Sequence, residues 1–585
     1  MARKSSSMYT MNNVYVTALI NSLNAMQPVT HWTRLVPLLM AQLGMSGSHA
    51  VAWCYSTPVK THMHNNKDIE DDEMITGKRA GLVMKNMLLN AVRFFWLWIL
   101  FSPVVLSTPI VVWGDTKKRK MWMRLLRRTL EISGPAFIKW GQWAATRADL
   151  FPRDMCEELE KLHADAPAHG YDVTAKAIED SFGFPLDVLF TEFDTLPVAS
   201  GSIGQVHRAT VSPVASRLTG MEEGALVAVK VRHPGVTESI HRDFALMTAV
   251  VRILCHLPAL RNLRLEESLK QFAAPLREQV DLSREGFYLH AFNYNFRKEP
   301  SVEFPVPLYP LVSQAVLVET FEPGEHISSY VAKGAGSPHN TELAQIGARA
   351  MLHMLIVDNL VHSDLHPGNI LVNLKPVGGT FGMTVWSNLA KFMNAFGVDV
   401  DLNRFLKPSV VLLDAGMCTE LSQEDQVNMV GLFESFSRLD ARDIADWTLR
   451  FAGDDQMCHD PDAFRADLEK AFRDMRENRL FDKGNTSSGA EALAAVLEMV
   501  RLHRVSLPGH ICATVVTTLV LEGWSHQLDP AHSTLNEVKR IISLKKGETK
   551  ARKAAMWIQQ AAVEREILEH VPPFIAAKHN NKFHL

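Results

Sequence analysis

The residues best suited to chemistry lie in one stretch, residues 361–372, which reads VHSDLHPGNILV. Asp364 stands five residues before Asn369 there, and an apolar run follows the asparagine. The catalytic loop of a kinase has this spacing, because its aspartate acts on the attacking hydroxyl and its asparagine oxygen binds magnesium. We therefore expect Asp364 to be catalytic and Asn369 to be a metal ligand.

A second candidate is Asp414, which follows an apolar run and begins the sequence Asp-Ala-Gly. A strand that leads into Asp-x-Gly carries the magnesium-binding aspartate of kinases, with Ala415 here in the position where phenylalanine is usual. Magnesium prefers oxygen ligands, so Asn369 and Asp414 together predict a Mg²⁺ site. Their separation is long for a kinase, and we interpret residues 375–408 as an insertion.

Lys230 stands in the strand-like sequence LVAVKV, residues 226–231. It matches the kinase lysine that contacts the α and β phosphates of ATP and pairs with a glutamate on a helix. Glu285, in the sequence DLSRE, is the candidate for that glutamate. We expect both residues to belong to the catalytic site.

A loop of small residues precedes Lys230. Small side chains let backbone amides approach phosphate oxygens closely, although this loop is not a true G-x-G-x-x-G. We expect the following residues to contact the nucleotide: Ala199, Ser200, Gly201, Ser202, Ile203, Gly204 and Val206.

The composition narrows the possible classes of protein. The 585 residues allow more than one domain, and a formal charge of -3 argues against a polyanion-binding protein. The hydrophobic content of 47% fits a globular protein with some membrane contact. The six cysteines form no C-x-x-C pair, which argues against a disulfide framework or a zinc site.

The amino terminus is basic and contains no acidic residue before Asp68. Acid-poor leaders of this kind are typical of mitochondrial transit peptides. We expect residues 1–75 to direct import into the mitochondrion.

Residues 94–113 form a run of twenty residues without a charge, long enough to cross a bilayer. Pro103 and Pro109 weaken the prediction of a spanning helix, and an interfacial or buried segment remains the alternative. More cations follow the run than precede it, and this excess predicts that the following domain faces the mitochondrial matrix from the inner membrane.

The pattern of apolar residues indicates which elements position these motifs. It predicts strands in four places: 198–209, 226–231, 315–321 and 409–414. It predicts helices in four stretches: 121–165, 238–299, 340–360 and most of 415–565. The fold class that follows is α+β, with two lobes as in protein kinases. We divide the chain into a transit region (1–75), a membrane segment (90–114), a helical extension (116–170), an N-lobe (190–322), a C-lobe with the insertion (323–525) and a helical tail (526–585).

The order of these motifs resembles the UbiB/aarF-domain family of atypical kinases, and most closely its type-2 branch. The resemblance rests also on Lys139 and Gln142 in FIKWGQ, which match the K-x-G-Q signature, and on the run TRADLFP at 146–152. It covers roughly residues 120–525. In that family the helical extension folds over the nucleotide site, so the resemblance implies that Lys139 and Gln142 act there.

The resemblance also implies that Glu319, in VETFEPG, belongs to the hinge that contacts the nucleotide. Two departures stand out. The family's alanine-rich A-A-A-S loop reads ASGS at 199–202, and Gly201 could alter nucleotide preference. The family's E-x-D reads Gln279-Val280-Asp281, with Glu278 displaced by one position, which puts a specific role for Glu278 in doubt.

The family is associated with coenzyme Q (ubiquinone) biosynthesis and lipid homeostasis. The resemblance implies an atypical kinase or ATPase that uses ATP and Mg²⁺ near a membrane. It implies a lipid membrane, isoprenoid or quinone lipids and coenzyme Q biosynthetic proteins as partners, and no nucleic acid.

Two other readings remain open. His366 stands where protein kinases often carry lysine, as in small-molecule phosphotransferases of the aminoglycoside- and choline-kinase type. The Lys139–Gln142 extension argues against that class. A nucleotide-binding pseudokinase scaffold is the other alternative. Complete loss of catalysis is disfavoured by four retained residues: Lys230, Asp364, Asn369 and Asp414.

Overall fold

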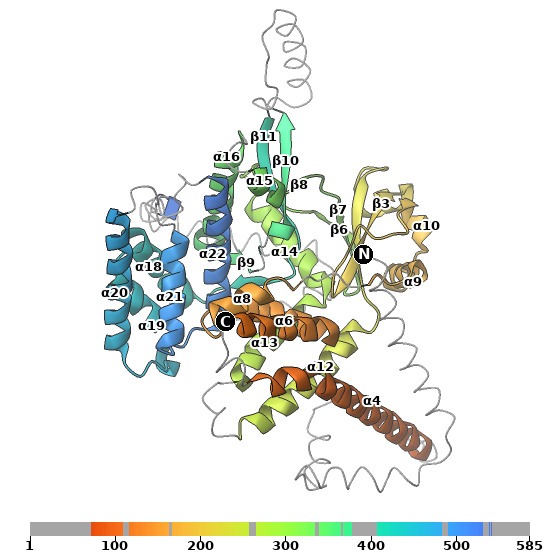
Figure 1. Ribbon diagram of the computed structural model, residues 1–585. Helices are drawn as coiled ribbons and strands as arrows, with labels where there is room; N and C mark the ends of the chain where they lie inside the picture. Colours follow the sequence, from red (N-terminus) through yellow and green to blue (C-terminus); the bar gives the residue numbers. More distant parts are fainter. Residues whose placement is uncertain are drawn as a thin grey trace, which may run out of the picture. The chain divides into compact units, whose positions relative to one another are not determined.

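The structure, a computed structural model, describes residues 72–108, 116–162, 167–256, 265–333, 338–363, 365, 367–376, 406–481, 489–529, 537–538 and 540 (Figure 1). The chain divides into two compact units, residues 1–86 and 87–585. Most of the transit region, most of the predicted insertion and most of the predicted helical tail lie outside the described residues. Asp364 and His366 also lie outside them.

A six-stranded antiparallel sheet carries the predicted nucleotide residues. Its strands pair in the order β1-β3-β4-β7-β6, with β2 beside β3. Their bounds are β1 Phe190–Phe193, β2 Ala199–Ser200, β3 Gly204–Val211, β4 Leu226–Arg232, β6 Pro307–Val312 and β7 Val316–Thr320. Three alternate residues of β4, Val227, Val229 and Val231, are fully buried on one face. Lys230 therefore points to the other face, because side chains alternate along a strand.

Three short helices pack beside this sheet: α9 (Tyr171–Phe182), α10 (Leu186–Leu189) and α11 (Pro213–Thr219). Three longer ones follow: α12 (Val236–Leu254), α13 (Leu265–Gln279) and α14 (Leu282–Asn295). Helix α14, which begins at the N-cap Asp281, packs against β6 and β7 and brings Glu285 toward β4.

A second sheet pairs in the order β5-β11-β10-β8 and holds the metal candidates. Its strands are β5 Val302–Glu303, β8 Glu325–His326, β10 Ile370–Pro376 and β11 Leu406–Leu412. Ile370 pairs with Leu412 and Pro376 with Leu406. Asn369 and Asp414 therefore lie at one end of this antiparallel pair, and residues 377–405 connect its other end.

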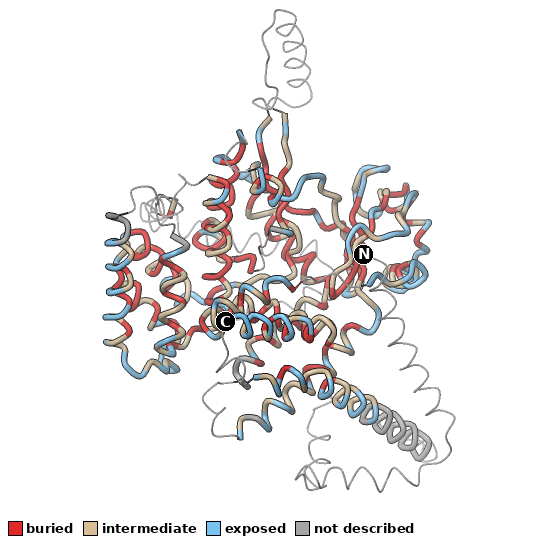
Figure 2. Tube along the Cα trace, viewed as in Figure 1, coloured by how far each residue is buried: buried red, intermediate tan, exposed pale blue. Residues whose placement is uncertain are grey.

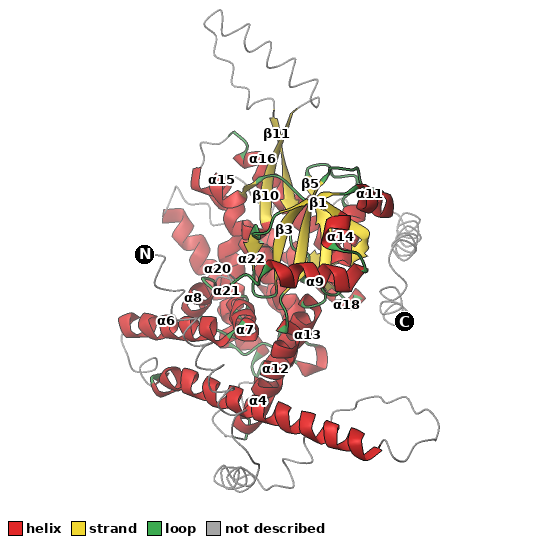
Figure 3. Cartoon of the chain, turned by 90° about the vertical axis from the view of Figure 1, so that its right-hand side faces the viewer, coloured by secondary structure: helices red, strands yellow, loops and turns green. Residues whose placement is uncertain are grey.

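Helices dominate the rest of the chain after β7 (Figure 3). They are α15 Ile327–Lys333, α16 Asn340–Leu352, α18 Gln423–Arg438, α19 Ala441–Arg450, α20 Pro461–Phe481, α21 Gly489–Leu502 and α22 Gly509–Leu528, with a short 3₁₀ turn η6 at Gly453–Asp455. The helix predicted over 340–360 is shorter: α16 passes into a π-helical turn, η3 (His353–Asp358), which ends at the left-handed Asn359. The short strands β9 (Leu360–His362) and β12 (Cys418–Glu420) pair with each other, and the 3₁₀ turn η4 (Pro367–Asn369) leads into β10.

The predicted extension consists of α6 (Thr116–Ser133), α7 (Pro135–Ala145) and α8 (Arg153–Leu159). A hydrophobic cluster joins α6 and α7 to α12, α13 and part of α4 (Asp72–Leu106), and it includes Leu97, Leu130, Phe137 and Phe272. The extension is thus packed onto the helices that precede α14.

The apolar part of α4, Leu88–Leu106, is long and apolar enough to cross a membrane, although one such helix is weak evidence for a span. One side of it is held by protein. Arg93 forms an ion pair of 2.9 Å with the buried Asp243, and the indole of Trp122 donates to the carbonyl of Val104 at 3.0 Å. The other side is exposed, with 66% of Trp98 and 69% of Ile99 accessible (Figure 2).

Candidate functional site

Lys230 is the centre of the candidate site. Its ammonium donates to both carboxylate oxygens of Glu285, at 2.7 and 2.8 Å. It also lies 3.5 Å from Asp414 Oδ1. Burial alone would lower the pKa of Lys230, but the charges of Asp414, Glu285 and Glu319 outweigh burial and raise it. Lys230 therefore remains a cation held among carboxylates, as a phosphate-binding lysine requires.

Asp414 follows β11 in a left-handed backbone conformation, with φ of 56°. Such a conformation is unfavourable for a residue other than glycine and is common at functional sites. The backbone N–H of Leu413 donates to the carbonyl of Asn369 at 2.9 Å, so the chain holds Asn369 beside the aspartate. The two predicted metal ligands thus come together from strands β10 and β11.

The charge state of Asp414 is set by its neighbours. Burial favours the neutral acid, but the positive charges of Lys230 and Lys139 outweigh it and hold the pKa of this carboxyl well below its usual range. The side chain of Asp414 is 45% exposed even though Lys230 lies beside it. An ionised, accessible oxygen ligand next to an asparagine suits a hard divalent cation.

Lys139 of the K-x-G-Q signature lies close enough to Asp414 for its charge to lower the pKa of that carboxyl. Lys139 lies on α7 and is partly exposed. Gln142, three residues further along α7, donates its amide to the carbonyl of Leu162 at 3.3 Å, a contact within the extension. The charge of Lys139 therefore acts on the candidate metal ligand Asp414. Gln142 instead forms a hydrogen bond with the segment after α8.

Glu319 lies on β7 opposite Ala228, on the same face of the sheet as Lys230. Its Oε2 is buried and has no hydrogen-bond partner among the described residues. Burial raises the pKa of Glu319, and the neighbouring Glu285 raises it further. The hinge glutamate is thus a third acid beside Lys230.

The loop of small residues runs between β2 and β3. Val206 pairs with Lys230 across β3 and β4, so both side chains lie on one face. A Cβ on Gly204 would come within 2.6 Å of the carbonyl of Val231, which leaves room only for glycine. The buried hydroxyls of Ser200 and Ser202 have no partner among the described residues. Ala199, Gly201 and Ile203 belong to the same turn.

Asp364 lies outside the described residues, but its neighbours are anchored. The hydroxyl of Ser363 bonds that of Thr419 at 2.7 Å, and its N–H donates to the carbonyl of Met417 at 2.9 Å. Thr517 of α22 donates to the carbonyl of Ser363 at 3.2 Å. The segment before the predicted catalytic aspartate is thus tied to the chain that follows Asp414.

Two residues of the run TRADLFP, Arg147 and Asp149, form a buried cluster. Arg147 makes a bidentate ion pair with Asp149, both bonds being 2.7 Å, and donates to Gln271 of α13 at 2.7 Å. The thiol of Cys512, on α22, donates to Asp149 at 2.9 Å. The cluster joins the extension to two distant helices. The displaced Glu278 instead pairs with Arg284 at 3.0 Å.

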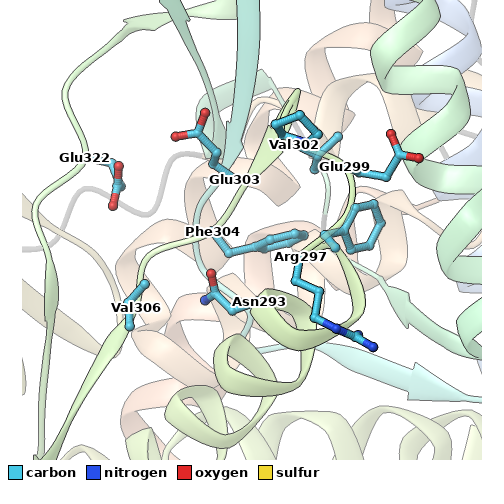
Figure 4. A pocket seen from close by; sticks show the side chains of 10 residues that line it. Asn293, Arg297, Glu299, Val302, Glu303, Phe304, Val306 and Glu322 are labelled. Atoms are coloured by element: carbon cyan, nitrogen blue, oxygen red, sulfur yellow. The ribbon is translucent and has the colours of Figure 1, made fainter. Parts of the chain in front are cut away.

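A separate cavity of about 290 Å³ lies beside the carboxyl end of α14. Asn293, Arg297, Glu303 and Glu322 are among its lining residues (Figure 4). None of the predicted site residues lines it, so it is not part of the candidate site.

Sequence reasoning missed a set of polar residues behind the nucleotide loop, which centres on His233 and Gln205. His233 precedes Pro-Gly after β4, and no motif distinguishes it. No short-range sequence pattern marks His233, because its partner His169 is 64 positions away in the chain.

Comparison with known proteins identifies the family. A model described as the ABC1 atypical kinase-like domain matches residues 161–448. A relative from Dictyostelium discoideum, "Probable serine/threonine-protein kinase abkC", is 32% identical, over 76% of this chain and 68% of its own length. A mitochondrial ABC1 family protein of Saccharomyces cerevisiae is 28% identical, over 75% of this chain and 72% of its own. "Probable protein kinase UbiB" of Pasteurella multocida is 27% identical, over 71% and 72% respectively. The predicted family resemblance is thereby confirmed, and the chain belongs to the ABC1 family of atypical kinase-like proteins.

Proposed function

We propose that this protein binds Mg-ATP at a two-lobed, kinase-type site and acts as an atypical kinase or ATPase. The observation that carries the proposal is the position of Lys230, 2.7 Å from Glu285 and 3.5 Å from Asp414. A lysine paired with a glutamate on a helix is the arrangement that positions the α and β phosphates in kinases.

The residues present suit the cofactor. Asn369 and Asp414 would hold Mg²⁺, which when bound neutralises phosphate charge. The loop at 199–206 would present backbone amides to the phosphates, and Glu319 would face the nucleotide from the hinge. Asp364, in the catalytic-loop position, would orient the acceptor hydroxyl or take its proton.

The extension favours this class over a small-molecule phosphotransferase. It places the Lys139 cation where it acts on Asp414, and the buried Arg147–Asp149 pair fastens the extension to α13 and α22. A helix held there would occupy space beside the proposed phosphate site. We infer that the extension restricts which acceptors reach the nucleotide.

We propose a mitochondrial location at the inner membrane, with the kinase-like domain in the matrix, and a role in coenzyme Q biosynthesis or lipid homeostasis. The names of the yeast relative ("mitochondrial") and the Pasteurella multocida relative ("UbiB") support this, as does the acid-free leader. Partners would be membrane lipids, isoprenoid or quinone lipids and coenzyme Q biosynthetic proteins. A fluorescent fusion of residues 1–75 should enter mitochondria, and a cytosolic fusion would contradict the location.

We propose that α4 attaches the protein to the membrane along the bilayer surface. Contacts at Arg93, Leu97 and Val104 hold one side of the helix to α12 and the extension, and a perpendicular span would have to break them. The opposite side exposes aromatic and aliphatic residues that suit the interface. Exposed cations of α6, among them Lys117, Lys120 and Arg124, would meet anionic headgroups.

Nucleotide binding by the purified full chain tests the main proposal. Thermal shift and equilibrium titration with ATP and ADP, with and without Mg²⁺, should show Mg²⁺-dependent binding that Lys230→Ala removes. Phosphate release should be measured with and without anionic vesicles. Binding without turnover under both conditions would favour the pseudokinase alternative, and no binding at all would reject a nucleotide site.

A further inference from the structure

Behind the nucleotide loop, five polar side chains form one continuous set of hydrogen bonds. Two of them, Gln205 and His207, lie on the sheet face opposite Lys230, because they alternate with Val206 along β3. Thr174, Gln205 and His207 are each 0% exposed. The members of this histidine relay are His169, Thr174, Gln205, His207 and His233.

One branch of the relay ends on the nucleotide loop. His233 Nε2 lies 2.9 Å from the carbonyl oxygen of Gly201, which can only accept, so this nitrogen carries the proton. In a neutral ring His233 Nδ1 then accepts from His169 Nδ1, at 2.7 Å. His169 Nε2 in turn accepts from the hydroxyl of Thr174 at 3.0 Å. With these tautomers every donor meets an acceptor while both rings are neutral.

The second branch holds His169 in place. The side-chain oxygen of Gln205 accepts the backbone N–H of His169 at 2.9 Å, and the Gln205 amide donates to the carbonyl of His169 at 3.2 Å. The same amide lies 2.9 Å from Nε2 of His207. Nδ1 of His207 donates to the backbone carbonyl of Asp194 at 2.8 Å. The buried glutamine therefore fixes the backbone of His169 and fits one tautomer of His207.

The contact with His233 orients the loop. The backbone N–H of His233 also donates to the carbonyl of Ile203, at 2.9 Å, so one residue holds the loop at two points. The C=O and N–H of a trans peptide point in opposite directions. A Gly201 carbonyl held toward His233 therefore turns the N–H of Ser202 to the opposite edge of that peptide.

We propose that His233, supported by His169 and Gln205, is a positioning residue for the nucleotide loop and makes nucleotide binding weaken as the pH falls. The inference rests on the proposed function, because it describes the regulation of that site. With these tautomers, a second proton on the His233 ring would sit on Nδ1 and face the N–H of His169 across 2.7 Å, whereas a second proton on the His169 ring would sit on Nε2 and face the hydroxyl proton of Thr174 across 3.0 Å.

The surroundings of the relay disfavour protonation of its histidines. Among the described residues, the titratable groups that face it are the three histidines themselves and Asp194, whose carboxylate is engaged by Arg208 at 3.0 Å. Burial, with the charges of His233 and His207, lowers the pKa of His169 to about 4. Burial also lowers the pKa of His207 and of His233. When the loop is released from the relay, the pKa values of the relay histidines return to about 6.5. Acid therefore favours the released loop.

The test compares the affinity for Mg-ATP at pH 7.5 and 5.5 in wild type, His233→Ala and His233→Gln. His233→Ala should weaken binding at pH 7.5 by about three- to tenfold, since one hydrogen bond to the loop is lost. Glutamine keeps a donor for Gly201 and does not titrate. His233→Gln should therefore bind like wild type at pH 7.5 and lose less affinity at pH 5.5. Titration of the nucleotide itself is common to both proteins and cancels.

Hydrogen exchange of the loop peptide 198–206, without nucleotide, separates this inference from the proposed function. His233→Ala should exchange faster than wild type, with His233→Gln between them, and His256→Ala, an exposed histidine outside the relay, should not differ. Unchanged exchange with unchanged affinity in His233→Ala would overturn the inference, as would equal pH dependence in wild type and His233→Gln. If wild type binds no nucleotide at either pH, the proposed function fails, while exchange still decides whether His233 orders the loop.

Discussion

Asp414 combines an unfavourable backbone with an exposed charge. A backbone φ of 56° costs a non-glycine residue on the order of 1–3 kcal/mol. The side chain of Asp414 nevertheless remains 45% accessible. Stability alone does not explain such a residue. Its position beside Asn369 and Lys230 indicates a ligand that is pre-positioned to bind a cation.

Asp414→Asn should greatly weaken the Mg²⁺-dependent part of ATP binding and leave Mg²⁺-free binding nearly unchanged. The amide keeps the shape and tolerates the left-handed backbone but cannot supply a charged ligand. Titration with ATP at several Mg²⁺ concentrations measures this. Asp443→Asn is a matched control, because that carboxylate is similarly exposed, at 47%. Equal losses in the two variants would contradict the assignment of Asp414.

Lys139→Ala should change nucleotide selectivity or self-phosphorylation and leave the melting temperature nearly unchanged. Its charge acts on Asp414, whereas loss of a partly exposed side chain usually costs within about 0.5 kcal/mol. Thermal shift with ATP and with ADP, run beside a self-phosphorylation assay, provides the readout. Lys161→Ala removes a cation from the same extension and should alter neither property. Identical behaviour of the two variants would make Lys139 an ordinary surface lysine.

The extension is an element whose attachment depends on buried charges. Side chains of Arg147 and Asp149 are each 2% exposed, and Gln271 and Cys512 complete their bonding from other helices. The guanidinium also lies 5.2 Å from the ring of Trp143. Removing one partner of such a pair leaves the other charge buried and unpaired, where it is poorly solvated.

Arg147→Ala should therefore lower the free energy of unfolding by about 3–5 kcal/mol. Denaturant unfolding of the full chain measures the loss. Arg153→Ala, in the same extension, removes an ion-paired arginine whose side chain is 79% exposed, and should cost no more than about 0.5 kcal/mol. A loss below about 1 kcal/mol for Arg147→Ala would show that the pair does not fasten the extension.

Helix α4 should lose membrane affinity when its exposed face becomes charged. Trp98→Asp is expected to weaken binding to anionic vesicles about tenfold or more, since burial of an aromatic side chain contributes roughly 1.5–3 kcal/mol. Vesicle sedimentation measures the effect. Leu196→Asp charges an 81% exposed leucine in the sheet region and serves as the control. Equal binding by the two variants would place the membrane contact elsewhere.

The three relay histidines should contribute stability that is lost as the pH drops below about 6.5. The folded-state pKa values of His169, His207 and His233 are lowered, chiefly by burial, so the unfolded chain takes up protons that the folded chain does not. Each therefore contributes stability above its unfolded pKa that is lost in acid. His353 acts oppositely: burial lowers its pKa, but the bond to Asp358 outweighs burial and raises it.

Glu285 and Glu319, whose pKa values burial raises to about 7 and about 8, also act oppositely, so the contribution of the relay is measured as a difference between proteins. The free energy of unfolding of wild type minus that of His169→Gln, from denaturant unfolding at pH 7.5, 6.5 and 5.5, should fall with the pH because glutamine does not titrate. A difference that does not change with pH would contradict this contribution.

Much of the candidate site follows from local sequence. The strands that carry Lys230 and Asp414, and the helix that carries Glu285, arise from alternating or helical spacing of apolar residues, which acts over a few positions. The motif spacings then relate these side chains to one known arrangement. This is why the pairing of Lys230 with Glu285, 55 residues apart, could be predicted.

Only the tertiary structure decided the contacts that have no motif. Arg93 meets Asp243 across 150 positions, Cys512 meets Asp149 across 363, and His169 meets His233 across 64. The sequence predicted an uncharged, membrane-active segment, but whether one side of α4 is covered depends on where α6 and α12 pack. Local propensity acts along the chain, whereas burial and hydrogen-bond pairing depend on which surfaces meet in the folded core, and no short-range pattern encodes that choice.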